Sequence, residues 1–307
     1  QFGVNVHVSA DYIFVCGQNN TRGVYVYDAN TYSYIRNLVP DGLAFDDLFG
    51  LSVSTNEDNV FISAMGDDDN GSNSGSVYVY DANDLSATPT KLTAFDGAAS
   101  DRFGHSVAAT SDKIFVGAYL DDDNGENSGS VYVYDANDLS ATPTKLTAFD
   151  GAGGEQFGQS VVTTADKIIV GSRADDDNGS ASGSVYVYDA NNLSAQPTKL
   201  TAFDGAANDL FGNLVATSDK IIVGAWGDDS FTGSVYVYDA NDLSAQPTKL
   251  TAFDGAADDR FGYSVAATAE QIIVGAYRDD SFTGSVYVCD INDLSAQPTT
   301  PTGFDGA

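Results

Sequence analysis

An acidic phrase recurs three times in this chain, each time just before an alternating run of valine and tyrosine. It reads DDDNGSNSGSVYVY at residues 67–80, DDDNGENSGSVYVY at 121–134 and DDDNGSASGSVYVY at 175–188. Aspartates two residues apart, followed by an asparagine, offer the hard oxygen ligands that calcium prefers. The same letters also suit a solvated hairpin, because Asn-Gly favours the positive φ of a tight turn. The sequence leaves both interpretations open.

The metal interpretation uses two aspartates of each phrase. The candidate ligands are Asp67, Asp69, Asp121, Asp123, Asp175 and Asp177. An aspartate of a neighbouring FDG motif could add oxygens, and Ca²⁺ is the only cofactor that the pattern suggests. The later repeats carry the shorter DDSFTG at 228–233 and 279–284, so we expect any such site at the three longer phrases.

Phe-Gly sets the period of the chain. The pair begins at residues 2, 49, 103, 157, 211 and 261, an interval of 47 to 54 residues. Each interval holds four short β-type runs punctuated by Gly, Asn, Asp and Pro. Twenty-four strands are too many for one open sheet, whereas radial repetition of four-stranded units protects their edges. We therefore predict an all-β fold, a six-bladed β-propeller of four-stranded antiparallel blades, as one domain over residues 1–307.

The two chain ends complete one repeat. GFDGA at 303–307 matches the phrase that precedes Phe-Gly elsewhere, and the initial QFG supplies its continuation. This pattern predicts a closed ring. The chain begins with Gln rather than Met, which we interpret as a processed product whose signal peptide has been removed.

The repeated motif resembles a known family. FGHSVAATSDKIFVGAY, followed by GSVYVYD, is similar to the FG-GAP repeat, especially its secreted bacterial and algal type, which is related to the propeller head of integrin α-subunits. The resemblance covers all six repeats and implies an extracellular or cell-surface recognition or adhesion module. Integrins carry a D-x-D-x-D-G calcium loop between the first two strands. Here that hairpin is only ATSDKI at 109–114, so we do not expect integrin-type calcium sites.

Residues that vary between repeats point to a partner surface. In antiparallel blades the acidic phrases and the connections between blades lie on one face, which is the ligand face of integrin-like propellers. Arg and aromatic residues are enriched at binding hot spots. The candidates on this face are Arg102, His105, Tyr119, Arg173, Trp226, Arg260, Tyr263, Tyr277 and Arg278. The lysines, in contrast, belong to repeated phrases, and we interpret them as scaffold.

Charge and motifs narrow the function. The chain has 44 acidic and 13 basic residues, a net charge of −31, which argues against nucleic acid or insertion into an anionic membrane as partners. We find no nucleophile elbow, P-loop or HExxH motif, and we expect no enzyme. Cys16 and Cys289 lie in the first and last repeats, where they form either a disulfide or two buried thiols.

The leading hypothesis is an extracellular recognition or adhesion module that binds a protein or glycan through these loops, with or without divalent cations. One alternative is a structural building block that self-assembles into an extracellular filament, sheath or surface layer. A second is an accessory binding domain of a larger secreted enzyme.

Overall fold

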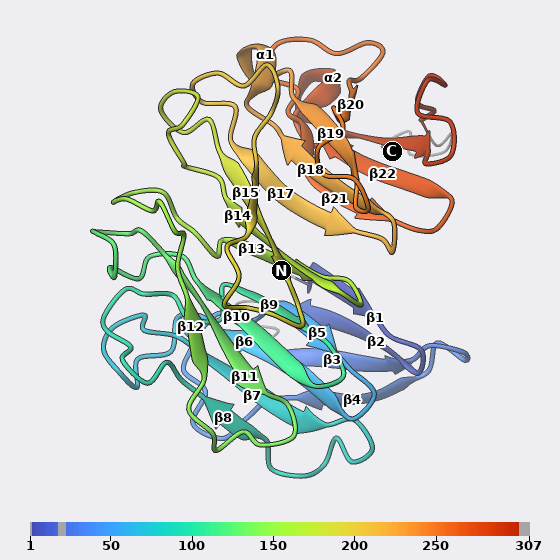
Figure 1. Cartoon of the computed structure of the whole chain (residues 1–307). Helices are drawn as coiled ribbons and strands as arrows, with labels where there is room; N and C mark the ends of the chain where they lie inside the picture. The colour runs from blue at the N-terminus through green and yellow to red at the C-terminus, as the bar shows by residue number, and fades with distance from the viewer. Residues whose placement is uncertain (1, 18–22, 301–307) are drawn as a thin grey trace. The chain divides into compact units, whose positions relative to one another are not determined.

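The structure is a computed structural model that describes residues 2–17 and 23–300 (Figure 1). The chain divides into two compact units, residues 1–161 and 162–307, with the boundary inside strand β13. The prediction of one domain stays a prediction, and the ring closure proposed from the chain ends falls on residues outside the described ones.

Unit 1 holds three four-stranded antiparallel sheets, one for each of the first three repeats. Their strands are β1 (Phe2–Val8), β2 (Tyr12–Gly17), β3 (Gly23–Asp28) and β4 (Tyr34–Leu38); β5 (Phe49–Thr55), β6 (Asn59–Ala64), β7 (Ser76–Asp81) and β8 (Thr90–Leu92); β9 (Ser106–Ala109), β10 (Lys113–Ala118), β11 (Ser130–Asp135) and β12 (Thr144–Leu146).

The fourth to sixth repeats form the remaining sheets. Their strands are β13 (Ser160–Thr163), β14 (Lys167–Ser172), β15 (Ser184–Asp189) and β16 (Thr198–Leu200); β17 (Phe211–Ala216), β18 (Lys220–Ala225), β19 (Ser234–Asp239) and β20 (Thr248–Leu250); β21 (Phe261–Ala267), β22 (Gln271–Ala276) and β23 (Ser285–Asp290). The prediction of an all-β chain with one small antiparallel sheet per repeat, the unit of a six-bladed β-propeller, is confirmed.

The sixth sheet differs from the prediction of four strands. Among the described residues it has three, and the fourth is reduced to one antiparallel bridge between Val288 and Thr299. The sequence gives a reason, because Pro301 stands where the fifth repeat has Leu250. Proline has no N–H to donate to a strand pair.

The valine and tyrosine of SVYVY face different neighbours. In β7, Tyr78 and Tyr80 pack in one hydrophobic cluster with Phe49, at the start of the same repeat. Val77 lies in the next cluster, with Phe103 of the following repeat. Both faces of the strand are therefore buried. The alternation of Val and Tyr decides which hydrophobic cluster each side chain joins, and it does not separate core from solvent.

A close backbone approach joins successive repeats. Phe103 N–H donates to the Ser74 carbonyl at 2.9 Å, and Gly75 forms a parallel bridge with Phe103. Gly75 has a φ of +88°, and a Cβ there would lie 2.0 Å from the Phe103 carbonyl oxygen. Only glycine fits this contact, and Gly233 meets Phe261 in the same way in unit 2.

The acidic phrase and the connection between repeats lie together, as predicted. Arg102 N–H donates to the Asn73 carbonyl, and Ser100 N–H donates to the Ser72 carbonyl. In the fifth and sixth repeats the shorter phrase forms a single helical turn, α1 (Asp228–Phe231) and α2 (Asp279–Phe282), interrupted by left-handed residues.

Candidate functional site

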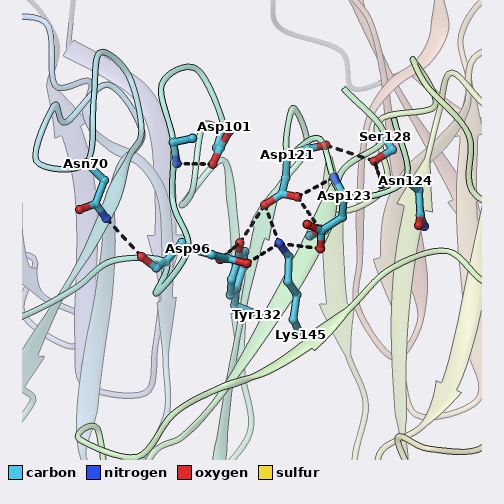
Figure 2. Close-up of polar contacts among 12 residues, drawn as sticks. Asn70, Asp96, Asp101, Asp121, Asp123, Asn124, Ser128, Tyr132 and Lys145 are labelled. Atoms are coloured by element: carbon cyan, nitrogen blue, oxygen red, sulfur yellow. Dashed lines mark hydrogen bonds and ion pairs between the residues drawn. The ribbon is translucent and has the colours of Figure 1, made fainter. Parts of the chain in front are cut away.

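Lys145 lies among the carboxylates of the acidic phrase (Figure 2). Its Nζ is 3.0 Å from Asp121 Oδ2, 2.7 Å from Asp123 Oδ2 and 2.9 Å from Asp96 Oδ2. It also lies 5.0 Å from the ring centroid of Tyr132, a cation–π distance. The Tyr132 hydroxyl is 2.7 Å from Asp96 Oδ1 and 2.8 Å from Asp121 Oδ2. An ammonium group therefore fills the centre of this acidic site.

The arrangement recurs in four repeats, and we call these sites the lysine–carboxylate clusters. Their central residues are Lys91, Lys145, Lys199 and Lys249. Each Nζ lies 2.6–3.0 Å from the first, buried aspartate of its phrase. Each also lies 5.0–5.4 Å from the tyrosine ring of the preceding strand.

Two of the clusters reach back to the preceding repeat. Asp96 binds Lys145 and Asp204 binds Lys249, at 2.9 and 2.8 Å, and both aspartates belong to the FDG motif of the repeat before. The sequence suggested that an FDG aspartate could join the acidic phrase, and these contacts confirm the proximity. Each of these clusters therefore ties two repeats together by charge.

The charges in these clusters stabilise one another. Burial disfavours the ammonium of Lys145, but hydrogen bonds to Asp123, Asp96 and Asp121 outweigh this effect, so its pKa lies above the usual lysine value. Burial likewise disfavours the Asp96 carboxylate, while Lys145 and Tyr132 favour it, and the pKa of Asp96 is lowered. Both groups are therefore charged at neutral pH.

These contacts bear on both interpretations of the acidic phrase. Asp67, Asp121 and Asp175 are buried, and a lysine ammonium contacts each of them and its partner Asp69, Asp123 or Asp177. The middle aspartate of each phrase is exposed, as expected for a solvated turn. Calcium at these positions would compete with the ammonium, and the metal site stays a prediction. Residues 2–17 and 23–300 contain no group of three or more His, Cys, Asp or Glu side chains able to hold a metal ion.

The lysines are the functional groups that the sequence reasoning missed. Each belongs to the repeated PTKL, which by itself predicts a scaffold role. A signal was present, since all four repeats that carry this lysine also carry an acidic phrase, and the first repeat, which has QNNTRG instead, lacks the lysine. The first repeat has Asn37, which pairs with Tyr25 as Lys91 pairs with Tyr78, and the sixth has Thr300.

A second buried acid lies beside the cluster. Asp101, in the connection between repeats, is 5% exposed and accepts a hydrogen bond from Ala98 N–H at 2.7 Å. Burial, and then the nearby charges of Asp121 and Asp122, raise the pKa of Asp101 to about 6. Burial is also the first cause of the raised pKa of Asp47 and Asp209, the equivalent residues of other repeats.

Five of the nine predicted surface residues gather in unit 2. The guanidinium of Arg260 lies 4.8 Å from the Trp226 ring centroid and 5.4 Å from that of Tyr277, and its NH1 donates to the Tyr277 hydroxyl at 2.6 Å. Tyr263 packs against Tyr277 with ring centroids 4.4 Å apart. Arg278 contacts Tyr277 and pairs with an aspartate, Asp258, at 3.0 Å.

Two further aromatic residues join this group, and the sequence reasoning did not include them. Phe231 lies 5.4 Å from the Arg260 guanidinium carbon, and Phe282 lies 5.2 Å from that of Arg278. Both come from DDSFTG and have a positive φ, which is rare for an aromatic residue. We call the seven residues the aromatic–arginine surface: Trp226, Phe231, Arg260, Tyr263, Tyr277, Arg278 and Phe282. Tyr263 is 47% exposed, Tyr277 43% and Phe282 71%.

The other predicted surface residues do not belong to this group. His105 and Tyr119 pack together in unit 1 with ring centroids 4.3 Å apart, and His105 N–H donates to the Arg102 carbonyl. Arg102 itself has a φ of +60°. Arg173 lies in unit 2 beside Gly212, where a Cβ would approach it to 3.2 Å.

Both cysteines are free thiols in this structure. Cys16 is buried in the core of unit 1 and Cys289 in the core of unit 2. Burial raises the pKa of Cys16 to about 12 and that of Cys289 to about 11, so neither is a reactive thiolate at neutral pH. The disulfide between them stays a prediction, which the mass of the non-reduced protein tests.

Comparison with known proteins identifies the repeat. The family model described as FG-GAP repeat matches residues 32–80, 88–134, 142–188, 195–238 and 245–289. The comparison with curated proteins finds no match. In the described part of the chain, no helix has the length and apolar character needed to cross a membrane. β-Propellers of this type generally mediate protein interactions. With five matched segments that cover most of its length, this chain belongs to the FG-GAP repeat family.

Proposed function

We propose that the chain is an extracellular recognition module that binds a partner protein through the aromatic–arginine surface. The observation that carries this proposal is the convergence of Trp226, Arg260, Tyr263, Tyr277 and Arg278, which stand at positions where the residue type changes between repeats. Packing within the repeats requires the same residues in each of them. Positions where the residue varies are therefore not determined by packing and can serve another role. Here Tyr263 and Tyr277 are exposed and Trp226, Arg260 and Arg278 are half-buried, and binding to a partner is the role that Tyr, Trp and Arg at such a surface fill best.

The physical state of these side chains supports binding. The rings of Trp226, Tyr263 and Tyr277 support one another, and the Arg260 guanidinium is held against two of them. A partner therefore meets side chains that are already ordered, and little conformational entropy is lost on association. The surrounding acidic surface would favour a partner with basic residues at the rim of its interface.

Extracellular location is part of the proposal and rests on the family and the charge. FG-GAP repeats are typical of extracellular proteins. A net charge of −31 keeps a protein soluble by self-repulsion and disfavours anionic partners. We infer that the chain acts by binding rather than by catalysis, because its acids are engaged with lysines or lie in repeated turns.

The test uses the purified chain on arrays of extracellular proteins and of glycans. We expect saturable binding to a protein, weakened at least about tenfold by Trp226→Ala and by Tyr277→Ala, as for hot-spot residues. Phe95→Ala is the matched control, since this exposed aromatic belongs to the repeated FDG motif of unit 1. Binding that survives both unit 2 substitutions contradicts the assigned surface.

Two other outcomes would replace the proposal. Saturable binding to glycans alone, lost in the same variants, would make the module a lectin. Self-association into large assemblies, seen by sedimentation velocity without any partner, would favour a structural building block.

A further inference from the structure

The sixth repeat builds the acidic cluster without its lysine. Tyr287 contacts Asp254 Oδ1 at 2.8 Å and Asp279 Oδ2 at 2.7 Å. In the fifth repeat the Tyr236 hydroxyl lies 2.7 Å from Asp204 Oδ1 and 3.4 Å from Asp228 Oδ2. These two aspartates there also bind Lys249 at 2.8 and 2.6 Å.

The strand register identifies the residue that replaces the lysine. Thr248 pairs with Val237 in the fifth sheet, and Thr299 pairs with Val288 in the sixth. The residue that follows is Lys249 in one and Thr300 in the other. Thr300 is exposed and has no positive charge to offer.

No other cation of the described chain replaces the missing ammonium. Within residues 2–17 and 23–300, no Lys or Arg forms an ion pair with Asp254 or Asp279. Arg278, next in sequence to Asp279, pairs with Asp258 instead. Outside the described residues, 301–307 include neither Lys nor Arg, and the one such residue is Arg22 of the first repeat.

The proton count shows what the sixth repeat lacks. A phenol has one proton to donate, yet Tyr287 lies at hydrogen-bond distance from two carboxylates. In the fifth repeat the three protons of the Lys249 ammonium complete the bonding. In the sixth, Asp280 N–H donates to Asp279 Oδ1 at 2.7 Å, but no ammonium lies between Asp254 and Asp279, the second of which is 7% exposed. A cation from outside the chain would relieve the repulsion between the two carboxylates, as Lys249 does in the fifth repeat.

The sister repeats show which cation the geometry accepts. In each of the four filled clusters it is a primary ammonium, 2.6–3.0 Å from carboxylate oxygens and over a tyrosine face. Calcium needs six to eight oxygens, more than two carboxylates and a phenol supply without many waters. An alkylammonium also gains from the ring face.

We propose that the sixth repeat is an open binding site for a primary ammonium group, and that its natural ligand is a lysine side chain of a partner protein. Asp254 and Asp279 accept its protons, and the Tyr287 ring covers one side of it. The site uses no residue of the aromatic–arginine surface, so it goes beyond the proposed function and can fail independently of it.

The first experiment measures thermal unfolding of the whole chain in n-butylammonium chloride, with sodium chloride keeping the ionic strength fixed. We expect a saturable rise of about 2–4 °C at ten times the dissociation constant. Thr300→Lys supplies the ammonium from within the chain, so it should raise the melting temperature by itself and abolish the response. Asp279→Asn should also abolish the response.

A further variant controls for the case in which a substitution abolishes the response only because the protein no longer folds. Lys249→Thr opens the same site in the fifth repeat, and n-butylammonium should then restore part of the lost melting temperature. The absence of any saturable response in the unmodified chain, or an equal response in Thr300→Lys, would overturn the proposal. A saturating shift with calcium, absent in Asp279→Asn and not produced by the amine, would make the site a metal site and would also overturn it.

The second experiment separates a lysine side chain from a small free amine. A blocked Gly-Lys-Gly peptide and its Nε-acetylated counterpart are titrated into the protein and followed by NMR. Binding of the first, weakened at least about tenfold by acetylation, supports the lysine assignment. Binding of n-butylammonium but of neither peptide overturns it.

Discussion

The lysine–carboxylate clusters and the aromatic–arginine surface both place cations against aromatic rings, but they differ in recurrence and burial. The clusters occur in four repeats, each around a buried aspartate. The aromatic–arginine surface occurs once, and its rings are up to 71% exposed. The recurrent cations neutralise aspartates that folding has buried, whereas Arg260 and Arg278 pair with the exposed Asp258 and lie against partly exposed rings.

The largest effect should come from emptying a lysine–carboxylate cluster. Lys145→Met leaves Asp121 buried beside Asp96 without its cation. We expect a loss of about 3–5 kcal/mol in the free energy of unfolding, measured by urea denaturation. Lys113→Met is the control, because Lys113 pairs only with the exposed Asp112 and should cost less than about 1 kcal/mol. Equal losses in the two variants would show that burial does not distinguish these pairs.

The next effect concerns the acid beside the cluster and depends on pH. Because the pKa of Asp101 is raised to about 6, the folded state holds this proton more tightly than the unfolded chain does. Its contribution to stability is therefore greatest below about pH 4 and is lost as the pH rises through 6. Asp101→Asn should gain on the order of 2 kcal/mol at pH 8 and little at pH 4.

The measurement is urea denaturation of both proteins across this pH range. Asp58→Asn makes the same change in net charge at an exposed position of unit 1 and serves as the control. A gain that is the same at pH 4 and pH 8, or one that the control reproduces, would contradict the assignment.

A smaller stability effect is expected from the aromatic–arginine surface. Arg260→Met removes the contacts with Trp226 and Tyr277 and should cost about 1 kcal/mol. Trp226 is the only tryptophan, so its fluorescence reports directly on this substitution. A changed emission spectrum with nearly unchanged unfolding fits a surface that folding does not need. A loss as large as that of Lys145→Met would place these residues with the structural clusters instead.

The smallest effect concerns the residue before Phe-Gly, which differs between repeats. It has a positive φ at Leu48, Arg102, Gln156, Leu210 and Arg260. Gln156→Gly removes the strain of a side chain in this conformation. Glycine also makes the unfolded chain more flexible, which offsets part of the gain. We therefore expect the free energy of unfolding to rise by roughly 0.5 kcal/mol. Gln159→Gly, three residues on, should instead lose stability, as calorimetry of both variants would show.

The fold was largely predictable because its information is local and repeated. The Phe-Gly interval gave the repeat, and the alternation of Val and Tyr gave its central strand. The role of Lys145 was not predictable in this way, because it depends on Asp96, which lies 49 residues earlier in the preceding repeat. The surface positions of Phe231 and Phe282 were not predictable for another reason. They depend on left-handed residues within a four-residue turn.

The reach of a cluster across two repeats makes the repeats interchangeable modules. At one junction between repeats, the preceding repeat contributes Asp96 and the following repeat contributes Tyr132 and Lys145. Removing residues 103–156 would bring the segment that ends with Arg102 directly before Phe157, with every motif still in phase. In the shortened sequence Asp96 would be followed by Tyr186 and Lys199, the same residue types at the same spacing as before. Recombination between repeats that carry the lysine would therefore keep an aspartate, a tyrosine and a lysine together at the seam.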